Sequence, residues 1–160
     1  MPDAYIGLGS NLGDRAALLE EARNAIAKQC GTITAASSVY ETAPWGPVAQ
    51  DDYLNQAVRI QTSLAPGMLL TRLRWIEAAL GRNREQEVRY GPRTMDLDIL
   101  YYEGAALDTP ELTLPHPRIL ERAFVLVPLA EIAPDLEIGG KRVAAALAVI
   151  DPGTVRPYAE

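Results

Sequence analysis

The sequence RYGPRTMDLDIL, residues 89–100, carries the clearest structural signal in the chain. Its second half alternates apolar and acidic side chains, which is typical of a β-strand with one face in a core. Leu97 and Ile99 fall on the apolar face. Asp96 and Asp98 fall on the other face, with their Cα atoms roughly 7 Å apart. Because buried like charges repel each other, this face needs a cleft or a cation beside it.

Five further elements upstream of this strand predict the fold class. The predicted order is a strand at 4–8, a helix at 14–29, a strand at 33–42, a strand at 53–62, a helix at 65–80 and the acidic strand at 95–102. This β-α-β-β-α-β order is typical of a ferredoxin-like α+β sandwich. A helix at 123–132, a hairpin around Gly139 and Gly140 and a helix at 143–150 add a C-terminal extension, which gives α/β/α layers. We expect a single domain over residues 1–160.

The composition excludes several classes of protein. Of the 160 residues, 48 % are hydrophobic and 22 % are charged, which is typical of a globular domain. A net charge of −6 argues against non-specific binding to nucleic acid or to an anionic membrane. Cys30 is the only cysteine, so no internal disulfide or cysteine-based zinc site is expected. The sequence has no signal peptide pattern and no long apolar run, so we expect a cytoplasmic protein, and we expect a monomer.

Arginines gather immediately before the acidic strand. Only two of the 15 basic residues are lysines. Six arginines lie in the second helix and the following loop, namely Arg72, Arg74, Arg82, Arg84, Arg89 and Arg93. Guanidinium groups beside a metal-binding carboxylate pair are what a polyphosphate substrate needs. The alternative is a set of surface ion pairs with Glu77, Glu85 and Glu87.

The carboxylate pair itself allows two interpretations. Asp96 and Asp98 could hold one Mg²⁺ ion, or a pair of ions about 4 Å apart. Alternatively, the strand faces solvent and its two carboxylates pair with nearby arginines, as charged side chains on edge strands often do.

Other polar positions give weaker signals. Tyr53, Asn55 and Ala57 share one face of their strand, next to a loop that contains two prolines and Trp45. They could form a flat pocket that combines aromatic stacking with amide recognition, or simply a half-buried sheet face. His116 lies between two prolines and is either structural or a ligand contact. Phe124, the only phenylalanine, is by default a core residue.

The glycine-rich start, YIGLGSNLGD, has the spacing GxGxxxG rather than the dinucleotide-binding GxGxxG. No phosphate-binding GxxxxGK[ST] loop occurs in the chain. We interpret these glycines as sites of close backbone packing followed by a helix start.

Four blocks of the sequence resemble the 6-hydroxymethyl-7,8-dihydropterin pyrophosphokinase family of folate biosynthesis. They are YIGLGSNLGDR, YETAPWGP with QDDYLNQAV, RYGPRTMDLDIL, and LPHPRILERAFVLVPLAEIAP, and they run from Tyr5 to Pro134. The resemblance implies a ferredoxin-like core. It also implies a reaction in which the pterin hydroxymethyl oxygen attacks the β-phosphorus of ATP, so that pyrophosphate is transferred and AMP is released.

The resemblance also implies roles for individual residues. Two Mg²⁺ ions would be held by Asp96 and Asp98, which with Arg82 and Arg93 would carry catalysis. ATP, the co-substrate, would be met by Arg74, Glu77, Arg84, Arg89, Arg93, Ile99, His116 and Arg122. The pterin would lie between Tyr90 and Phe124, with Thr42, Ala43, Trp45, Tyr53 and Asn55 around its edge.

The sequence departs from the common family pattern at several of these positions. Ala43 stands where proline is frequent, and Trp45 stands where a smaller apolar residue is usual. Tyr90 replaces a frequent tryptophan, and Arg74 replaces a frequent glutamine. These differences bear on the loops and the adenine contacts rather than on the reaction.

Two other functions fit parts of the pattern. An RNA-recognition domain shares the predicted core, but it needs exposed aromatics and a basic face, and here the sheet would present Asp96 and Asp98. A Mg²⁺-dependent phosphate hydrolase would use the same carboxylates, but it would cleave ATP without a pterin acceptor.

Overall fold

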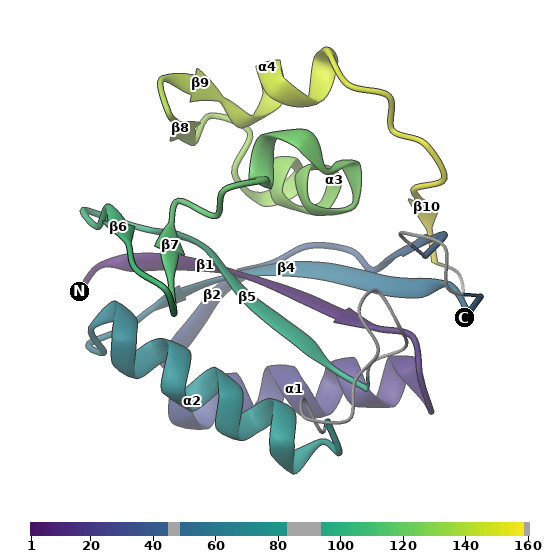
Figure 1. Ribbon diagram of the computed structural model, residues 1–160, viewed down its shortest axis with the longest axis horizontal. Coiled ribbons are helices and arrows are strands. Elements are labelled where there is room, and N and C mark those ends of the chain that lie inside the picture. The colour runs from purple at the N-terminus through teal and green to yellow at the C-terminus, as the bar shows by residue number, and fades with distance from the viewer. Residues whose placement is uncertain (45–48, 83–93, 159–160) are drawn as a thin grey trace.

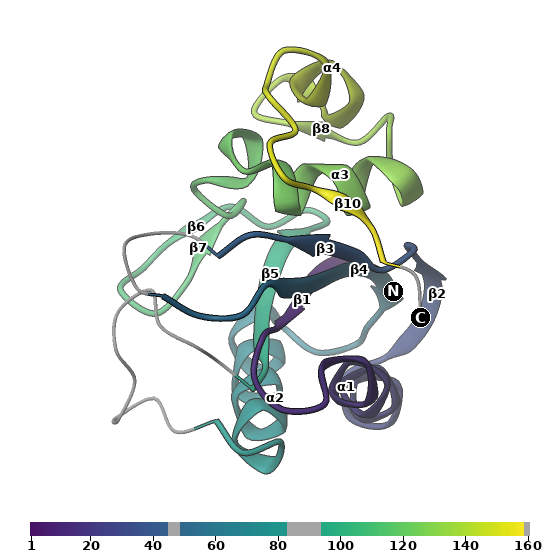
Figure 2. The same ribbon diagram turned by 90° about the vertical axis from the view of Figure 1, so that its right-hand side faces the viewer.

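A computed structural model describes residues 1–44, 49–82 and 94–158 of the chain. An antiparallel sheet lies between two layers of helices (Figures 1 and 2). Helices α1 (Arg15–Gln29) and α2 (Pro66–Ala79) cover one face of the sheet. Helices α3 (Ala123–Ile132) and α4 (Val143–Ala148) lie on the opposite side. Over the part of the chain that the structure describes, no helix could span a membrane.

Within the described part of the chain, the main sheet has six strands, all paired in the antiparallel sense. They are β1 (Asp3–Ser10), β2 (Thr32–Ala36), β3 (Tyr40–Thr42), β4 (Tyr53–Gln61), β5 (Asp96–Tyr102) and β10 (Arg156–Pro157). The strand order is β10-β3-β4-β1-β5, and β2 also pairs with β4. Strand β1 therefore lies between β4 and β5, which places the start of the chain in the centre of the sheet.

Smaller elements connect and extend this sheet. They are the hairpin of β6 (Leu107–Asp108) and β7 (Thr113–Leu114), a 3₁₀ helix (Ile119–Glu121), and the hairpin of β8 (Glu137–Ile138) and β9 (Lys141–Arg142). The second hairpin turns at Gly139 and Gly140, as predicted, and both glycines have positive φ angles. The first hairpin, the 3₁₀ helix and β10 were not predicted, because segments this short carry no readable periodicity.

Alternation along the strands divides the apolar residues between two cores. On β1, Ala4, Ile6 and Leu8 pack with helices α1 and α2, together with Leu97 and Ile99 of β5. The opposite face supplies a second core beneath α3 and α4, which includes Tyr5, Leu100, Leu126 and Leu129. Strand β1 therefore contributes side chains to both cores, from alternate positions along the strand.

The strand predicted at 33–42 is two strands, β2 and β3. Between them the Ser37 hydroxyl donates a hydrogen bond to the Ser38 carbonyl oxygen (2.7 Å) and accepts one from the Ala57 amide (3.0 Å). The Ser37 side chain thus accepts the hydrogen bond of the Ala57 amide, which a backbone carbonyl oxygen would accept in a continuous ladder. Serine competes with regular structure in this way, which explains why the single predicted strand was wrong. The predicted helix at 143–150 also ends early, at Ala148.

Helix α1 begins within one residue of its predicted start, and beyond its end the chain passes very close to the backbone of β4. Asp14 caps the helix by accepting a hydrogen bond from the Ala17 amide (3.2 Å). After the helix, a Cβ atom on Gly31 would lie 2.2 Å from the Gln61 carbonyl oxygen. Only glycine lets the chain pass β4 this closely as it enters β2.

The thiol of Cys30 is expected to be chemically inert in the folded protein. Cys30 is buried at the end of α1, and this burial, partly offset by the positive charge of Arg72, raises its pKa to about 11. The thiolate is the reactive form, so modification by Ellman's reagent near pH 8 should be on the order of a hundredfold slower in the folded than in the urea-unfolded chain. Stopped-flow absorbance measures both rates, and equal rates would show that the thiol is accessible.

Candidate active site

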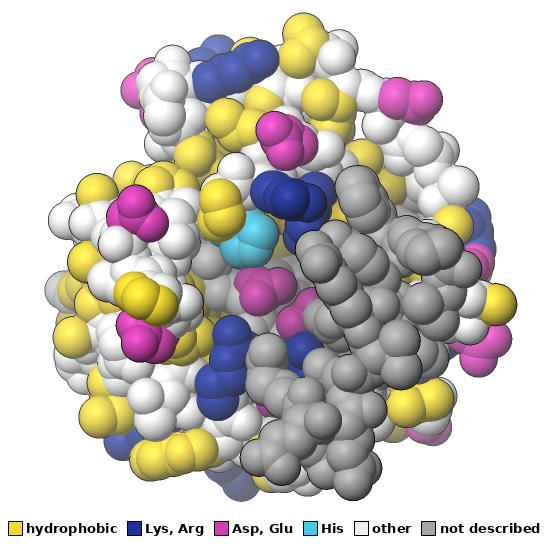
Figure 3. Space-filling view, in the orientation of Figure 1, with side chains coloured by type: hydrophobic (Ala, Val, Ile, Leu, Met, Phe, Trp, Pro, Cys, Tyr) yellow, Lys and Arg dark blue, Asp and Glu magenta, His cyan; other side chains and the backbone are white. Residues whose placement is uncertain are grey.

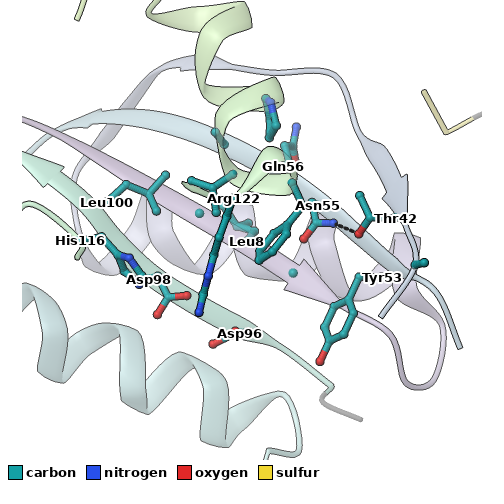
Figure 4. Close-up of a pocket in the computed structure, with 17 residues that line it drawn as sticks. Leu8, Thr42, Tyr53, Asn55, Gln56, Asp96, Asp98, Leu100, His116 and Arg122 are labelled. Atoms are coloured by element: carbon teal, nitrogen blue, oxygen red, sulfur yellow. Dashed lines mark hydrogen bonds between the residues drawn. The ribbon is translucent and has the colours of Figure 1, made fainter. Parts of the chain in front are cut away.

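A pocket of about 180 Å³ opens over the sheet, where β1, β4 and β5 pass beneath the start of α3 (Figure 4). The strands contribute Gly7, Leu8 and Gly9 from β1, Tyr53, Asn55, Gln56 and Ala57 from β4, and Asp96, Asp98 and Leu100 from β5. Thr42, Ala43, His116, Arg122, Phe124, Val125 and Pro128 complete the lining. In the space-filling view, acidic, basic and histidine side chains gather in the hollow between the helix layers (Figure 3).

The register of the sheet arranges the pocket floor in two rows across three strands. One row consists of Asn55, Gly9 and Asp96, and the other consists of Ala57, Gly7 and Asp98. Since neighbouring strands lie about 4.8 Å apart, each row spans roughly 10 Å from β4 to β5. The amide side of the pocket is therefore separated from its acidic side by one strand that carries no side chain there.

Gly7 and Gly9 keep this central strip flat. A Cβ atom on Gly7 would lie 3.3 Å from Leu100 Cδ2, and one on Gly9 would lie 3.2 Å from Asn55 Oδ1. The second distance also shows that the Asn55 carbonyl oxygen lies directly beside the strip. A planar ligand could therefore lie against backbone at this position, with an amide oxygen at its edge.

Thr42 holds the Asn55 side chain in this orientation. The Asn55 Nδ2 donates a hydrogen bond of 2.8 Å to the Thr42 hydroxyl, and the two residues are 6 % and 4 % exposed. Because the amide nitrogen is occupied by Thr42, its oxygen remains the group that faces the glycine strip. Tyr53, at the start of the same strand, extends beside them (Figure 4).

Asp96 and Asp98 occupy the opposite side of the pocket. Both are half-buried, and both project from the pocket face of β5 while Leu97 lies in the core between them. Burial, followed by repulsion from Asp96, raises the pKa of Asp98 to about 7, against the opposing effects of Arg74 and Arg82. The site therefore carries an electrostatic cost that a bound cation would relieve.

Glu77 of α2 joins the arginines to this strand. Its Oε2 accepts hydrogen bonds from Arg74 Nη1 (3.0 Å), Arg82 Nη1 (3.0 Å) and the Leu97 amide (2.8 Å). Arg82 Nη1 also donates to Asp96 Oδ1 at 3.0 Å. Glu77 is 1 % exposed and Arg82 is 8 % exposed, so this is a buried network rather than a set of surface pairs.

His116 and Arg122 border the pocket from the chain segment before α3. Burial and the nearby charge of Arg122 lower the pKa of His116, which favours the neutral form of its ring. The Arg118 amide donates to Nδ1 of His116 (3.3 Å), which leaves Nε2 to carry the proton. The guanidinium of Arg122 lies 5.7 Å from the Phe124 ring centroid and extends toward the aspartates (Figure 4).

A second pocket of about 220 Å³ adjoins the first. It is lined by Leu70 and Arg74 of α2, by Ile99, and by the segment 109–113 with Pro117. Asp98 and His116 line both pockets. Two ligands bound in the two pockets would therefore meet at Asp98.

The donor set at this junction suits a metal ion that arrives with a phosphorylated ligand. Among the residues that the structure describes, no group of three or more His, Cys, Asp or Glu side chains could form a complete metal site. Mg²⁺ is commonly held by only one or two protein carboxylates, with water and substrate phosphates as its other ligands. Asp96 and Asp98 fit that pattern.

The structure gathers most of the predicted site residues around the two pockets. Those that line one or both are Thr42, Ala43, Arg74, Tyr53, Asn55, Asp96, Asp98, Ile99, His116, Arg122 and Phe124. Glu77 and Arg82 lie behind β5 in the buried network. The interpretation of Phe124 as a core residue was wrong, because it stands at the pocket wall. Trp45, Arg84, Arg89, Tyr90 and Arg93 lie outside the described residues.

Sequence analysis missed the floor of the site. The sequence predicts that Gly7 and Gly9 serve only close packing, and no local pattern marks four further lining residues, Gln56, Leu100, Val125 and Pro128. One signal was available, since two glycines at positions i and i+2 of a strand clear one face of side chains. What that cleared face would meet depends on strand order, which the local pattern does not show.

Comparison with known proteins agrees with this geometry. The family model described as 7,8-dihydro-6-hydroxymethylpterin-pyrophosphokinase matches residues 5–134. A curated 2-amino-4-hydroxy-6-hydroxymethyldihydropteridine pyrophosphokinase of Methylorubrum extorquens is 54 % identical, over 97 % of this chain and 98 % of its own. The enzyme of the same name from Bacillus subtilis is 50 % identical over 84 % of this chain and 80 % of its own.

Solved structures share the fold at much lower identity. The wild-type HPPK-DHPS of Plasmodium falciparum superposes with a TM-score of 0.72 at 16 % identity, covering 92 % of this chain. The match covers 40 % of that longer chain. Sequence, fold and site geometry agree, and the chain belongs to the 7,8-dihydro-6-hydroxymethylpterin-pyrophosphokinase family.

Proposed function

We propose that this chain transfers pyrophosphate from ATP to the hydroxymethyl group of 6-hydroxymethyl-7,8-dihydropterin and releases AMP, in folate biosynthesis. The observation that carries the proposal is the arrangement of the pocket floor. An amide and an aromatic ring lie at its β4 end, two carboxylates lie at its β5 end, and a strip of glycine backbone separates them. Transfer from a polyphosphate donor to a flat acceptor needs one end that binds the acceptor and one that binds the donor, a short distance apart.

The β4 end suits the pterin. A pterin is a planar ring with hydrogen-bond donors and acceptors along its edge. The Asn55 oxygen, held in place by Thr42, supplies an acceptor, and the glycine strip supplies a flat surface. Phe124 and Tyr53 line the same volume and offer aromatic contact. The pterin would then project its hydroxymethyl group toward Asp96 and Asp98.

The second pocket suits the nucleotide. Arg74 and His116 line it beside the backbone segment 109–113, and Arg122 borders the junction with the first pocket. The His116 Nε2–H would donate a hydrogen bond to the nucleotide, and the two arginines would supply positive charge for the phosphate oxygens. Arg82 and the predicted loop arginines Arg84, Arg89 and Arg93 would complete the positive field.

Asp96 and Asp98 would hold Mg²⁺. We propose two ions, because the phosphate chain needs a cation on each side of the pyrophosphate group that is transferred. When bound, Mg²⁺ neutralises phosphate charge and relieves the repulsion between the aspartates. The hydroxymethyl oxygen would form a bond to the β-phosphorus and lose its proton, while the bond from the β-phosphorus to the oxygen that bridges it to the α-phosphorus breaks. AMP then leaves with that bridging oxygen. The protein contributes position and electrostatic stabilisation rather than covalent chemistry.

The strand order supports a ferredoxin-like classification of the core. With β2 and β3 counted as one interrupted strand, the order of the four core strands is second, third, first, fourth. Helices α1 and α2 lie together on one face. Both ends of the proposed site come from one chain, which supports activity as a monomer.

Gly9→Ala is expected to raise the KM for the pterin on the order of tenfold and to leave the KM for ATP nearly unchanged. The added methyl group would lie 3.2 Å from Asn55 Oδ1, so the amide must shift away from the glycine strip. Gly67→Ala, on α2 with nothing within 4 Å of the added atom, is the matched control. Steady-state kinetics with each substrate varied in turn would test this, and equal changes in both KM values would argue against pterin binding at Gly9.

One assay tests the proposed function directly. Purified protein is mixed with Mg²⁺, ATP and reduced hydroxymethylpterin, and AMP is followed by chromatography. AMP formation that requires the pterin supports the proposal. ATP cleavage at the same rate without pterin would point to a phosphate hydrolase, and tight Mg²⁺-independent binding of single-stranded RNA in a gel shift would point to an RNA-binding domain.

A further inference from the structure

The C-terminal segment of the chain returns to the sheet beside the pterin end of the site (Figures 1 and 2). Strand β10 pairs with β3, with Arg156 opposite Glu41 and Pro157 opposite Tyr40. The Tyr158 amide extends this pairing by donating to the Val39 carbonyl oxygen at 3.0 Å. The family match ends at residue 134, so these contacts come from a part of the chain outside it.

The first contact holds the chain where it leaves β3. The backbone amide of Ala43 donates a hydrogen bond of 2.8 Å to the Thr154 hydroxyl. Ala43 lines the pocket, and its neighbour Thr42 orients the Asn55 amide. A displacement of Ala43 would therefore shift Thr42, and Thr42 orients the Asn55 amide that faces the ligand.

The second contact holds the chain where it enters β4. Arg156 Nη2 donates to Asp52 Oδ2 at 2.7 Å and to Glu41 Oε1 at 2.9 Å. Asp52 immediately precedes Tyr53, which lines the pocket. One nitrogen atom of Arg156 thus ties together the two ends of the segment that joins β3 to β4.

Arg15 of α1 completes this network from the other side. Its Nη1 donates to Glu41 Oε2 at 2.8 Å and to the Asp52 carbonyl oxygen at 2.9 Å. The Arg15 guanidinium also lies 5.8 Å from the Tyr158 ring centroid. Glu41 therefore receives one arginine on each of its carboxylate oxygens, and both arginines reach Asp52.

These bonds are poorly suited to stabilising the fold. The side chains of Arg156 and Asp52 are 48 % and 37 % exposed, and exposed ion pairs contribute little to folding free energy. Their geometry has a different consequence, since each joins backbone segments that are remote in sequence and adjacent at the pocket. Holding a binding site in its bound geometry before the ligand arrives lowers the entropy lost on binding.

We propose that Thr154 and Arg156 are positioning residues for the pterin, acting through Ala43, Glu41 and Asp52 on the residues that line the pocket. This rests on the proposed function, because it assigns the β4 end of the pocket to the pterin. The C-terminal strand sets the width of that end, and ATP, which binds beside β5 and α2, is not affected by it.

The experiment compares Arg156→Ala and Arg156→Lys with the wild-type protein and with Arg142→Ala. Arg142 makes a more exposed ion pair, with Asp135, and lines neither pocket, so it is the control. Because a single Arg156 nitrogen makes both bonds, a lysine ammonium can replace it. We expect Arg156→Ala to raise the pterin KM and the calorimetric pterin Kd about three- to tenfold, with the ATP KM unchanged, and Arg156→Lys to restore most of the affinity.

Thr154→Val and Thr154→Ser test the second contact independently of Arg156. Valine keeps the shape of threonine and removes the acceptor for the Ala43 amide, whereas serine keeps the acceptor. We expect weaker pterin binding for valine and near wild-type binding for serine. The Arg156→Ala, Asp52→Asn double variant should bind pterin no more weakly than Arg156→Ala alone, because Arg156→Ala has already removed the bond that Asp52→Asn would weaken.

The outcomes separate this proposal from the function on which it rests. If the wild-type protein binds no pterin and forms no pterin-dependent AMP, the proposed function and this inference both fail. If the wild-type protein is active, but Arg156→Ala and Thr154→Val bind pterin as tightly as it does, only the inference fails. Equal weakening of ATP and pterin, with a lowered Tm, would assign the C-terminal strand a purely structural role and would also overturn the inference.

Discussion

Asp98→Asn is expected to lower kcat/KM by about a thousandfold or more while the protein stays folded. The substitution removes one of the two carboxylates at the junction of the two pockets, and with it the charge that would hold Mg²⁺ against the phosphates. Asp96→Asn should have a similar effect, although Asp96 also pairs with Arg82. Turnover is measured as pterin-dependent AMP release, and folding by circular dichroism.

Asp135→Asn is the control for this prediction. Asp135 is an exposed carboxylate between α3 and β8 that lines neither pocket, and its loss should leave turnover unchanged. Wild-type rates for Asp98→Asn would remove the basis for placing a metal ion at β5. A loss of rate together with a loss of structure would show instead that the carboxylate supports the fold.

Asp98→Asn should also change how the stability of the metal-free protein depends on pH. The pKa of Asp98 rises from 3.8 to about 7 on folding, so between these values the folded chain binds a proton that the unfolded chain has released. The free energy of unfolding therefore falls as pH rises through this window. Asp98→Asn cannot release that proton, so the variant should show a flatter profile and greater stability above pH 7 in the presence of a chelator. Urea titrations at a series of pH values would show this, and parallel profiles for both proteins would contradict it.

Glu77→Ala is expected to lower the free energy of unfolding by about 3 kcal/mol or more, the largest stability effect that we predict. Glu77 is 1 % exposed and receives hydrogen bonds from two arginines and from the backbone of β5. Its removal leaves the buried guanidinium of Arg82 with less compensation and the Leu97 amide without its acceptor. Arg82 still meets Asp96 at 3.0 Å, which keeps the loss below that of an isolated buried charge.

A double-mutant cycle identifies the origin of this loss. Glu77→Ala combined with Arg82→Ala should cost less than the sum of the two single changes, because each single change already removes the ion pair between these two residues. Glu20→Ala, an exposed glutamate on α1, should change stability by less than about 0.5 kcal/mol and serves as the control. Additive losses in urea denaturation would show that Glu77 and Arg82 act separately.

Glu77 also shows why some site residues could not be assigned from sequence. The resemblance predicted a contact with ATP, and the alternative was a surface ion pair with an arginine. In the structure the carboxylate is buried between α2 and β5, where it orients Arg82 and Arg74. A helix residue becomes buried or exposed according to what packs on that face of the helix, and β5 reaches α2 only in the folded chain.

Elements with a strong local period were predicted well. The helix at 123–132 agrees with α3, and the strand at 53–62 agrees with β4 to within one residue. The predicted order of helices and strands matches the mixed α/β fold. Two-residue strands such as β10 were missed, because their pairing comes from a partner more than 100 residues away, and two residues show no period.

The sequence by itself determined which side chains share a face. Period-two spacing puts Asp96 with Asp98, and Tyr53 with Asn55, whatever the strands later pair with, because alternation is a property of the extended backbone. Only the tertiary structure decided that these two faces lie on the same side of one sheet with Gly7 and Gly9 between them. Strand order and register depend on pairing between distant segments, and that pairing turns two polar faces and two glycines into one site.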